Sequence, residues 1–173
     1  MGLYLNPNAD AFLGDKSTRI YVDKSLLIKE LNSLVGTKED FICMSRPRRF
    51  GKSMAGNMIS AYYSKGCDTR EVFSQMKLGE EVGFDKYLNK FNVIKLDLNE
   101  LYQNAIVENT INTLIDEINK NLLKEFRNQF PEIDFTDNSS LARCIKDVYS
   151  KTGEKFVIII DEYDVLMREQ VPQ

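Results

Sequence analysis

The chain has 173 residues, 43% of them hydrophobic and 28% charged, which is long enough and apolar enough to bury the core of one domain. Its net charge of −3 and pI near 5.2 argue against a generally basic nucleic-acid-binding protein. No stretch has the length of a membrane helix and the N-terminus does not read as a signal peptide, so we expect a cytoplasmic protein without a membrane partner.

The histidine and cysteine content restricts the available chemistry. The sequence has no histidine, and its three cysteines, Cys43, Cys67 and Cys144, are widely spaced without a C-x-x-C pair. This excludes histidine-based acid–base catalysis and most zinc sites. Buried thiols are the simplest interpretation of the cysteines. Any catalysis therefore has to use carboxylates, lysine, arginine, serine and a metal ion held by oxygen atoms.

The first forty residues predict a loop followed by one helix. Asp23 is a favourable N-cap for a helix over residues 24–35, in which leucines recur at helical spacing, and Gly36 is expected to end it. Tyr21 and Asp23 are placed where they could contact a nucleotide base or ribose. Packing and helix capping, however, explain both residues without a ligand.

The most informative stretch is CMSRPRRFGKSM, residues 43–54. An apolar segment, expected to be a strand over residues 40–45, leads into a turn and then into a run that favours a helix. Strand, turn, Gly-Lys-Ser and helix is the order of a phosphate-binding loop, whose backbone N–H groups and helix dipole hold phosphate oxygens. Lys52 would then reach the β- and γ-phosphates, and the Ser53 hydroxyl would hold Mg²⁺.

This loop departs from the pattern G-x-x-x-x-G-K-[ST] at its first glycine, which is replaced by arginine. The candidate nucleotide-binding residues are Arg46, Pro47, Arg48, Arg49, Phe50, Gly51, Lys52, Ser53 and Met54. Proline supplies a fixed φ where the glycine is missing, and the three arginines add positive charge. An ordinary basic turn before a helix has the same composition. The arginines could also hold a nucleic-acid backbone, although a triphosphate satisfies them equally well.

The middle of the chain predicts one strand and two helices. Residues 91–98 are expected to form a second strand, and Asp97 near its end is either a turn cap or a site residue. A long amphipathic helix is predicted over residues 104–130, and Pro131 stops it. Another helix is expected to start at residues 138–139 and to end at Gly153. These helices would cover the sheet between its strands.

The second informative stretch is KFVIIIDEYD, residues 155–164. Its consecutive apolar residues predict a parallel strand over residues 156–161, buried on both faces, that ends in Asp161 and Glu162. In nucleoside-triphosphate hydrolases the acid at this point holds Mg²⁺ and the next carboxylate acts as general base. We therefore assign Ser53 and Asp161 to the metal and Glu162 to catalysis. A buried strand with a charged end also occurs in other α/β proteins, but its combination with the Gly-Lys-Ser loop favours a nucleotide site.

Four segments together carry a resemblance to a known family: IYVDKSLLIKEL, SRPRRFGKS, DTREVF and VIIIDEYDVLM. They resemble the AAA-ATPase-like domain of a bacterial and archaeal family, over about residues 4–168. In that family the domain usually precedes a nuclease-like domain of the PD-(D/E)XK type, and a loop rich in arginine without the first glycine is a family trait. The resemblance implies a P-loop core that uses ATP and Mg²⁺.

We expect an α/β fold, a P-loop NTPase-like three-layer sandwich around a parallel sheet, in which residues 1–173 form a single domain. The sheet is expected to be incomplete after the acidic strand, because related ATPases add a further strand, a sensor residue and an arginine finger later in the chain. Apolar strands with unpaired edges would favour self-association or a protein partner. Two functions stay open: Mg-dependent ATP hydrolysis in the complete protein, or a catalytically incompetent nucleotide- or protein-binding remnant.

Overall fold

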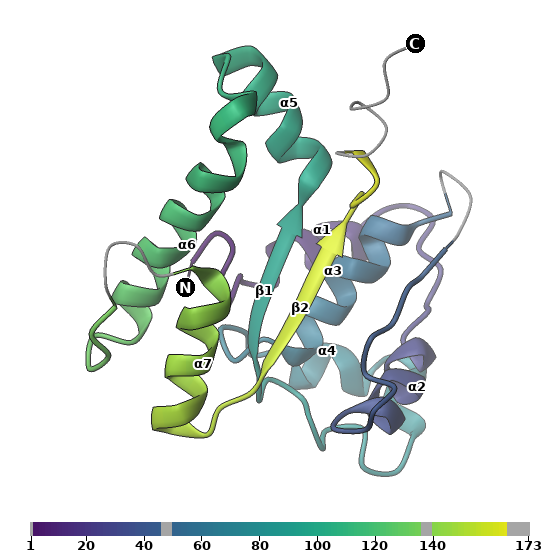
Figure 1. The fold of residues 1–173 in the computed structure, drawn as a ribbon. Coiled ribbons are helices and arrows are strands. Elements are labelled where there is room, and N and C mark those ends of the chain that lie inside the picture. The colour runs from purple at the N-terminus through teal and green to yellow at the C-terminus, as the bar shows by residue number, and fades with distance from the viewer. Residues whose placement is uncertain (1, 46–49, 136–139, 166–173) are drawn as a thin grey trace. The chain divides into compact units, whose positions relative to one another are not determined.

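Two parallel strands, β1 (Asn92–Asp97) and β2 (Phe156–Asp161), form the sheet of the computed structural model, which describes residues 2–45, 50–135 and 140–165 (Figure 1). The register pairs Asn92 with Phe156 at one end and Asp97 with Asp161 at the other. Both strands lie where apolar residues predicted them, but the prediction that β2 is buried on both faces is wrong, because Ile158 and Ile160 are half exposed. The chain is therefore an α/β protein with a small parallel sheet, compatible with a P-loop-like fold, and the three-layer sandwich stays a prediction.

The other regular elements of the described residues are helices. In chain order they are α1 (Asp10–Lys16), α2 (Leu26–Leu34), α3 (Lys52–Tyr63), α4 (Arg70–Ser74), the 3₁₀ helix η1 (Lys77–Glu80), α5 (Leu98–Glu108), the 3₁₀ helix η2 (Ile111–Thr113), α6 (Leu114–Gln129) and α7 (Leu141–Thr152). The chain divides into two units, one of residues 7–91 and one of residues 1–6 with 92–173. No helix in the described part of the chain is both long and apolar enough to cross a membrane.

The strand predicted over residues 40–45 is not formed. These residues have no regular secondary structure, and Phe41 is 97% exposed. A strand is stabilised by a neighbour that pairs with its backbone N–H and C=O groups, and the sheet of the described residues contains β1 and β2 only. An apolar sequence alone does not supply that neighbour.

The single long helix predicted over residues 104–130 is also wrong, because the chain turns at Asn109. This residue adopts φ +57°, in the left-handed region that asparagine tolerates, and it ends α5. The N–H of Thr110 donates to the Ala105 carbonyl at 2.8 Å, which closes the end of the helix. α5 begins earlier than predicted because the Asp97 carboxylate accepts from the N–H of Glu100 at 3.0 Å. The turn-cap interpretation of Asp97 is therefore confirmed.

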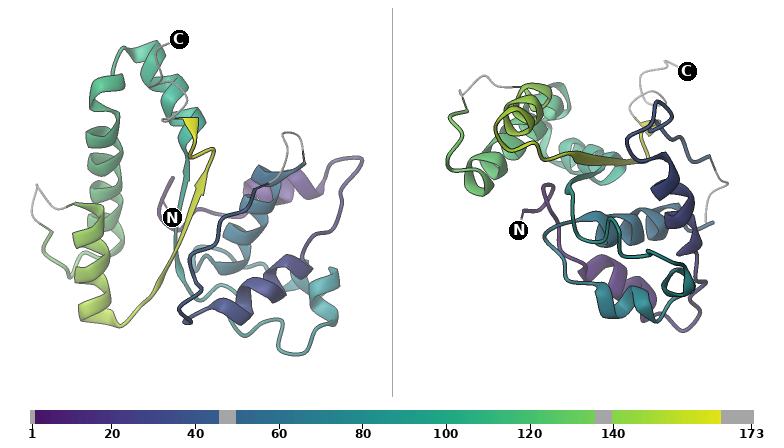
Figure 2. Two further views of the ribbon diagram at one scale, coloured as in Figure 1. Left: turned by 45° about the vertical axis from the view of Figure 1, so that its right-hand side comes forward. Right: turned by 90° about the horizontal axis from the view of Figure 1, so that it is seen from below.

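In the unit of residues 1–6 and 92–173, α6 and α7 lie side by side against one face of the sheet (Figures 1 and 2). Leu122 and Phe126 of α6 and Val148 of α7 are buried with Ile94 and Leu96 of β1. The two strand residues share a face because they are two positions apart. Ser140 accepts from the N–H of Arg143 at the start of α7, and Gly153, at φ +70°, ends it where the sequence predicted.

The N-terminal residues are bound to the same unit. The backbone N–H groups of Leu3 and Leu5 each donate to the Glu125 carboxylate at 2.7 Å. The N–H of Asn6 donates to the Val93 carbonyl at 2.7 Å, and Leu5 is fully buried. The carboxylate thus satisfies backbone donors that have no helix or strand partner.

The unit of residues 7–91 is helical and has an aromatic core. Phe12 of α1 stacks on Phe73 of α4 with ring centroids 5.2 Å apart, and Tyr62 of α3 meets Phe73 edge-on at 5.3 Å. Ile28 of α2 and Met58 of α3 are buried in the unit as well. Aromatic pairs at these distances fix helix positions well. The end of α3 is therefore held by the core while its first turn carries Lys52 and Ser53.

Candidate functional site

The turn before α3 ends at a glycine in a left-handed conformation. Gly51 is the N-cap of α3, with φ +72° and ψ 40°, in the left-handed region that side chains rarely adopt. Its carbonyl accepts from the N–H of Ala55 at 3.1 Å, so the helix starts directly behind it. The requirement for glycine at this position is therefore a backbone requirement.

Lys52, Ser53 and Met54 form the first turn of α3. Lys52 and Met54 are half-buried and Ser53 is exposed. The first N–H groups of a helix have no partner within the helix and carry its positive dipole end, which suits an anion. The predicted contributions of Arg46, Pro47, Arg48 and Arg49 lie outside the described residues. Among the predicted loop residues, Phe50 to Met54 are placed in one continuous turn.

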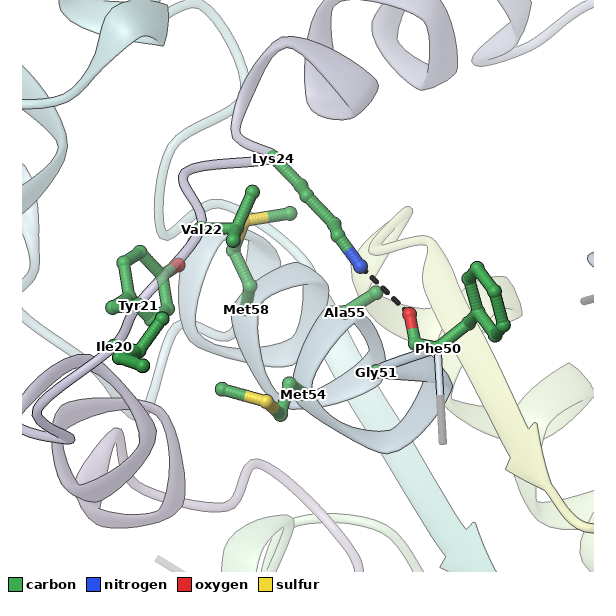
Figure 3. A pocket seen from close by; sticks show the side chains of 9 residues that line it. All are labelled: Ile20, Tyr21, Val22, Lys24, Phe50, Gly51, Met54, Ala55 and Met58. Atoms are coloured by element: carbon green, nitrogen blue, oxygen red, sulfur yellow. Dashed lines mark hydrogen bonds between the residues drawn. The ribbon is translucent and has the colours of Figure 1, made fainter. Parts of the chain in front are cut away.

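A pocket of about 270 Å³ borders this turn (Figure 3). Its walls come from residues 20–22, Lys24, residues 50–51 and three residues of α3, namely Met54, Ala55 and Met58. Apart from the lysine and the Tyr21 hydroxyl, the side chains that line it are aliphatic, aromatic or thioether groups. The pocket therefore offers apolar contacts directly beside Gly51.

The side chain of Lys24, a residue just before α2, extends to the turn before α3. Its Nζ donates to the Phe50 carbonyl oxygen at 2.7 Å (Figure 3). A Cβ atom placed on Gly51 would lie 3.1 Å from the same nitrogen, which is tighter than an ordinary contact. Lys24 thus brings a cation to the described part of the turn, in addition to Lys52, and binds one of its carbonyl groups.

Tyr21 stays a neutral phenol over the physiological pH range. Burial, with the carboxylates of Asp23 and Asp15 nearby, raises the pKa of Tyr21 to about 12. Its ring lines the pocket and its hydroxyl remains a hydrogen-bond donor. Tyr21 is therefore suited to contact an uncharged ring.

The predicted acidic pair lies at the carboxyl end of β2. Asp161 is the last residue of the strand, and its Oδ1 accepts from the N–H of Glu162 at 3.0 Å. Glu162 has φ +50°, which is uncommon for a residue with a side chain and is often found at functional sites. The carbonyl of Glu162 accepts from the N–H of Val165 at 3.1 Å. The pair is therefore held in a tight turn directly after the strand.

Asp97 lies beside Asp161, because the two residues are partners in the register at the carboxyl ends of β1 and β2. Ligands of α/β sheets bind at this end of the strands. No cluster of three cysteine, aspartate or glutamate residues suited to a metal ion is present in residues 2–45, 50–135 and 140–165. A metal at this sheet end would therefore depend on water and ligand oxygens as well as on protein carboxylates.

The structure groups the predicted residues in two sets. Gly51, Lys52 and Ser53 belong to the unit of residues 7–91, and Asp161 and Glu162 belong to the unit with the sheet. That the two sets share one site stays a prediction. Sequence reasoning missed Lys24, which lies 26 positions before Phe50, and the apolar pocket residues Val22 and Met58, because no motif spacing links these residues to the loop.

Of the three cysteines, only Cys144 is buried; Cys67 is half-buried and Cys43 is exposed, so the interpretation of all three as buried thiols is wrong. The exposure of Cys43 follows from the missing strand at residues 40–45, whose side chains are all exposed.

Comparison with known proteins identifies one family. A family model described as a predicted AAA-ATPase, AAA-ATPase-like, matches residues 15–173. No curated protein and no solved structure matches the chain. The match includes the loop before α3, the pocket residues and the acidic turn after β2.

Proposed function

Since the chain belongs to the AAA-ATPase-like family of predicted AAA-ATPases, which indicates nucleotide binding, we propose that it binds ATP with Mg²⁺ at the turn before α3 and hydrolyses it. The observation that carries the proposal is the conformation of Gly51, left-handed and directly followed by Lys52 and Ser53 at the start of a 12-residue helix. A glycine turn followed by a lysine at the start of a helix can offer several backbone N–H groups and one ammonium group to a single anion.

The roles of the residues follow from their chemistry. Lys52 would neutralise the β- and γ-phosphate oxygens, and the base of the nucleotide would lie in the apolar pocket beside Tyr21. The exposed Ser53 hydroxyl and the Asp161 carboxylate are hard oxygen donors of the kind that Mg²⁺ prefers, so these residues fit the ion. When bound, the ion neutralises charge on the phosphates.

Glu162 is the proposed general base. Its carboxylate would take a proton from a water molecule while that water attacks the γ-phosphorus and the bond to the bridging oxygen of ADP breaks. The proton then passes to the released phosphate. The tight turn that begins at Glu162, closed by the hydrogen bond from the N–H of Val165 to the Glu162 carbonyl, would restrict the direction of this side chain.

The proposal is tested by titration calorimetry with Mg-ATP and by phosphate release. Lys52→Ala should weaken ATP binding by about tenfold or more, because a charge-assisted contact to phosphate is lost. Glu162→Gln should bind ATP like the wild type but release phosphate about 100-fold more slowly.

Lys120→Ala, on the exposed face of α6, is the matched control and should change neither quantity. Unchanged ATP affinity of Lys52→Ala would refute the phosphate-loop assignment. If the chain bound ATP but showed no phosphate release that Glu162→Gln reduces, the alternative of a nucleotide-binding remnant would be supported instead.

A further inference from the structure

We propose that Lys24 is a positioning residue that sets the direction of the Gly51 N–H group for binding a nucleotide phosphate. This inference rests on the proposed function, because it names how one donor of the phosphate loop is oriented. It starts from the hydrogen bond of 2.7 Å between Lys24 Nζ and the Phe50 carbonyl oxygen.

The carbonyl of Phe50 and the N–H of Gly51 belong to one planar peptide group. In a trans peptide these two bonds point in opposite directions. When Lys24 holds the oxygen, the N–H is therefore directed away from Lys24. If the peptide turned over, its oxygen would replace the N–H, and a carbonyl oxygen repels phosphate.

Gly51 makes such a rotation accessible. Without a Cβ atom, glycine populates positive and negative φ about equally, so its present φ of +72° is not enforced by its own side chain. A contact from outside the turn can therefore select one orientation of this peptide group. Lys24 is suited to this because its Nζ lies 3.1 Å from the position that a Cβ on Gly51 would occupy.

The backbone that carries Lys24 is itself anchored on both sides. The Asp23 carboxylate accepts from the N–H of Ser25 at 2.8 Å and from the N–H of Lys77 at 2.9 Å. Ser25 is fully buried, and its Oγ accepts from the N–H of Leu78 at 3.0 Å. The backbone of Lys24 is therefore held in place, which restricts the positions from which its side chain can bind the Phe50 carbonyl.

The first test uses the protein without nucleotide. In NMR spectra of the ¹⁵N-labelled chain, the Gly51 amide of the wild type should give one resonance. Lys24→Met keeps the length of the side chain but removes the donor, and it should broaden or split this resonance as the peptide samples two orientations. Lys24→Arg, which keeps a donor, should restore the single resonance.

Lys90→Met is the matched control, because Lys90 Nζ also donates to a backbone carbonyl, that of Lys86, at 2.9 Å. This variant should leave the Gly51 resonance as in the wild type. An unchanged single Gly51 resonance in Lys24→Met would overturn the proposal.

The second test measures the affinities for Mg-ATP and Mg-ADP at low and at high salt. When the Gly51 N–H points away from the nucleotide, a hydrogen bond to a phosphate group that ATP and ADP share is lost. Lys24→Met should therefore bind both nucleotides about tenfold more weakly at either salt concentration. Lys24→Arg should recover most of the affinity.

A loss confined to ATP that disappears at high salt would show a direct, screened contact of Lys24 with the γ-phosphate and would overturn the positioning role. If the wild type bound neither nucleotide, the proposed function would be refuted. The NMR test would still show whether Lys24 sets the orientation of the Phe50–Gly51 peptide group.

Discussion

At the residue scale, Asn89 connects the end of α3 to the start of α4 through several hydrogen bonds of its side chain. Its Nδ2 donates to the carbonyls of Ala61 and Ser64, each at 3.0 Å, and its Oδ1 accepts from the N–H of Thr69 at 3.1 Å. Its φ of +55° lies in the left-handed region. The last carbonyls of a helix have no partner within the helix, so this side chain stabilises the end of α3 opposite the candidate phosphate loop.

Asn89→Ala should lower the free energy of unfolding by about 2 kcal/mol, because it leaves partly buried backbone groups without partners and places alanine at positive φ. Urea unfolding monitored by circular dichroism measures this change. Asn89→Gly is the control for backbone strain and should be more stable than Asn89→Ala by about 1 kcal/mol. A midpoint of Asn89→Ala equal to that of the wild type would contradict the capping role.

At the scale of elements, the start of α2 is tied to η1 by Asp23. Sequence reasoning predicted Asp23 as the N-cap, whereas the N-cap residue is Ser25, and Asp23 accepts from the N–H of Ser25 just ahead of the helix. Burial alone would raise the pKa of the Asp23 carboxyl. The hydrogen bonds from the N–H of Lys77 and from Ser25 outweigh burial, and the pKa is lowered below its usual 3.8.

A lowered pKa in the folded state means that the ionised form of Asp23 stabilises the fold. This contribution is complete at pH values above about 4, and it is lost as the pH falls from there through the lower pKa of the folded state. In urea unfolding between about pH 6 and pH 3, the stability of the wild type should therefore fall more steeply than that of Asp23→Asn. Parallel curves for the two proteins would show that this carboxylate does not link α2 to η1.

At the scale of the whole molecule, the apolar strand β2 is less covered than β1. Ile158 and Ile160 are each 49% exposed, although the register places them on the same face as the buried Ile94 and Leu96. In the described part of the chain β2 pairs with β1 on one side only. Such a strand offers both backbone groups and apolar side chains to another chain, which supports the predicted association through a sheet edge.

We expect the chain to self-associate as its concentration rises, and Ile160→Lys to reduce this association without changing the fold, because the side chain is half exposed. Sedimentation velocity over a concentration series measures the effect. Ile115→Lys is the matched control, since Ile115 on α6 is 66% exposed and should tolerate lysine without effect on assembly. A wild type that is monomeric at all concentrations, or equal behaviour of the two variants, would contradict a role for β2.

Local signals in the sequence predicted several elements well. The acidic strand and the strand before Asp97 lie where apolar runs indicated them, and Gly153 ends α7 as expected. These signals succeed because hydrophobic periodicity and glycine conformations act within a few residues.

Some predictions failed because the outcome depends on distant partners, and one failed because a single residue adopts a local conformation that the hydrophobic pattern does not signal. Residues 40–45 have the sequence of a strand but no neighbouring strand in the described residues, and the long helix is interrupted because Asn109 accepts a left-handed turn. Lys24 was not recognised at the loop, because nothing in its local sequence indicates that its side chain reaches a carbonyl 26 positions away.

The sequence by itself determined the chemical inventory: a Gly-Lys-Ser turn, an acidic pair after an apolar strand, and the family to which both belong. Only the tertiary structure decided which further groups meet the turn, namely the ammonium of Lys24 and the apolar pocket around Tyr21. The physical reason is that a motif consists of residues close together in the sequence. The contacts that orient a peptide group or surround a ligand come from packing between segments far apart in the chain.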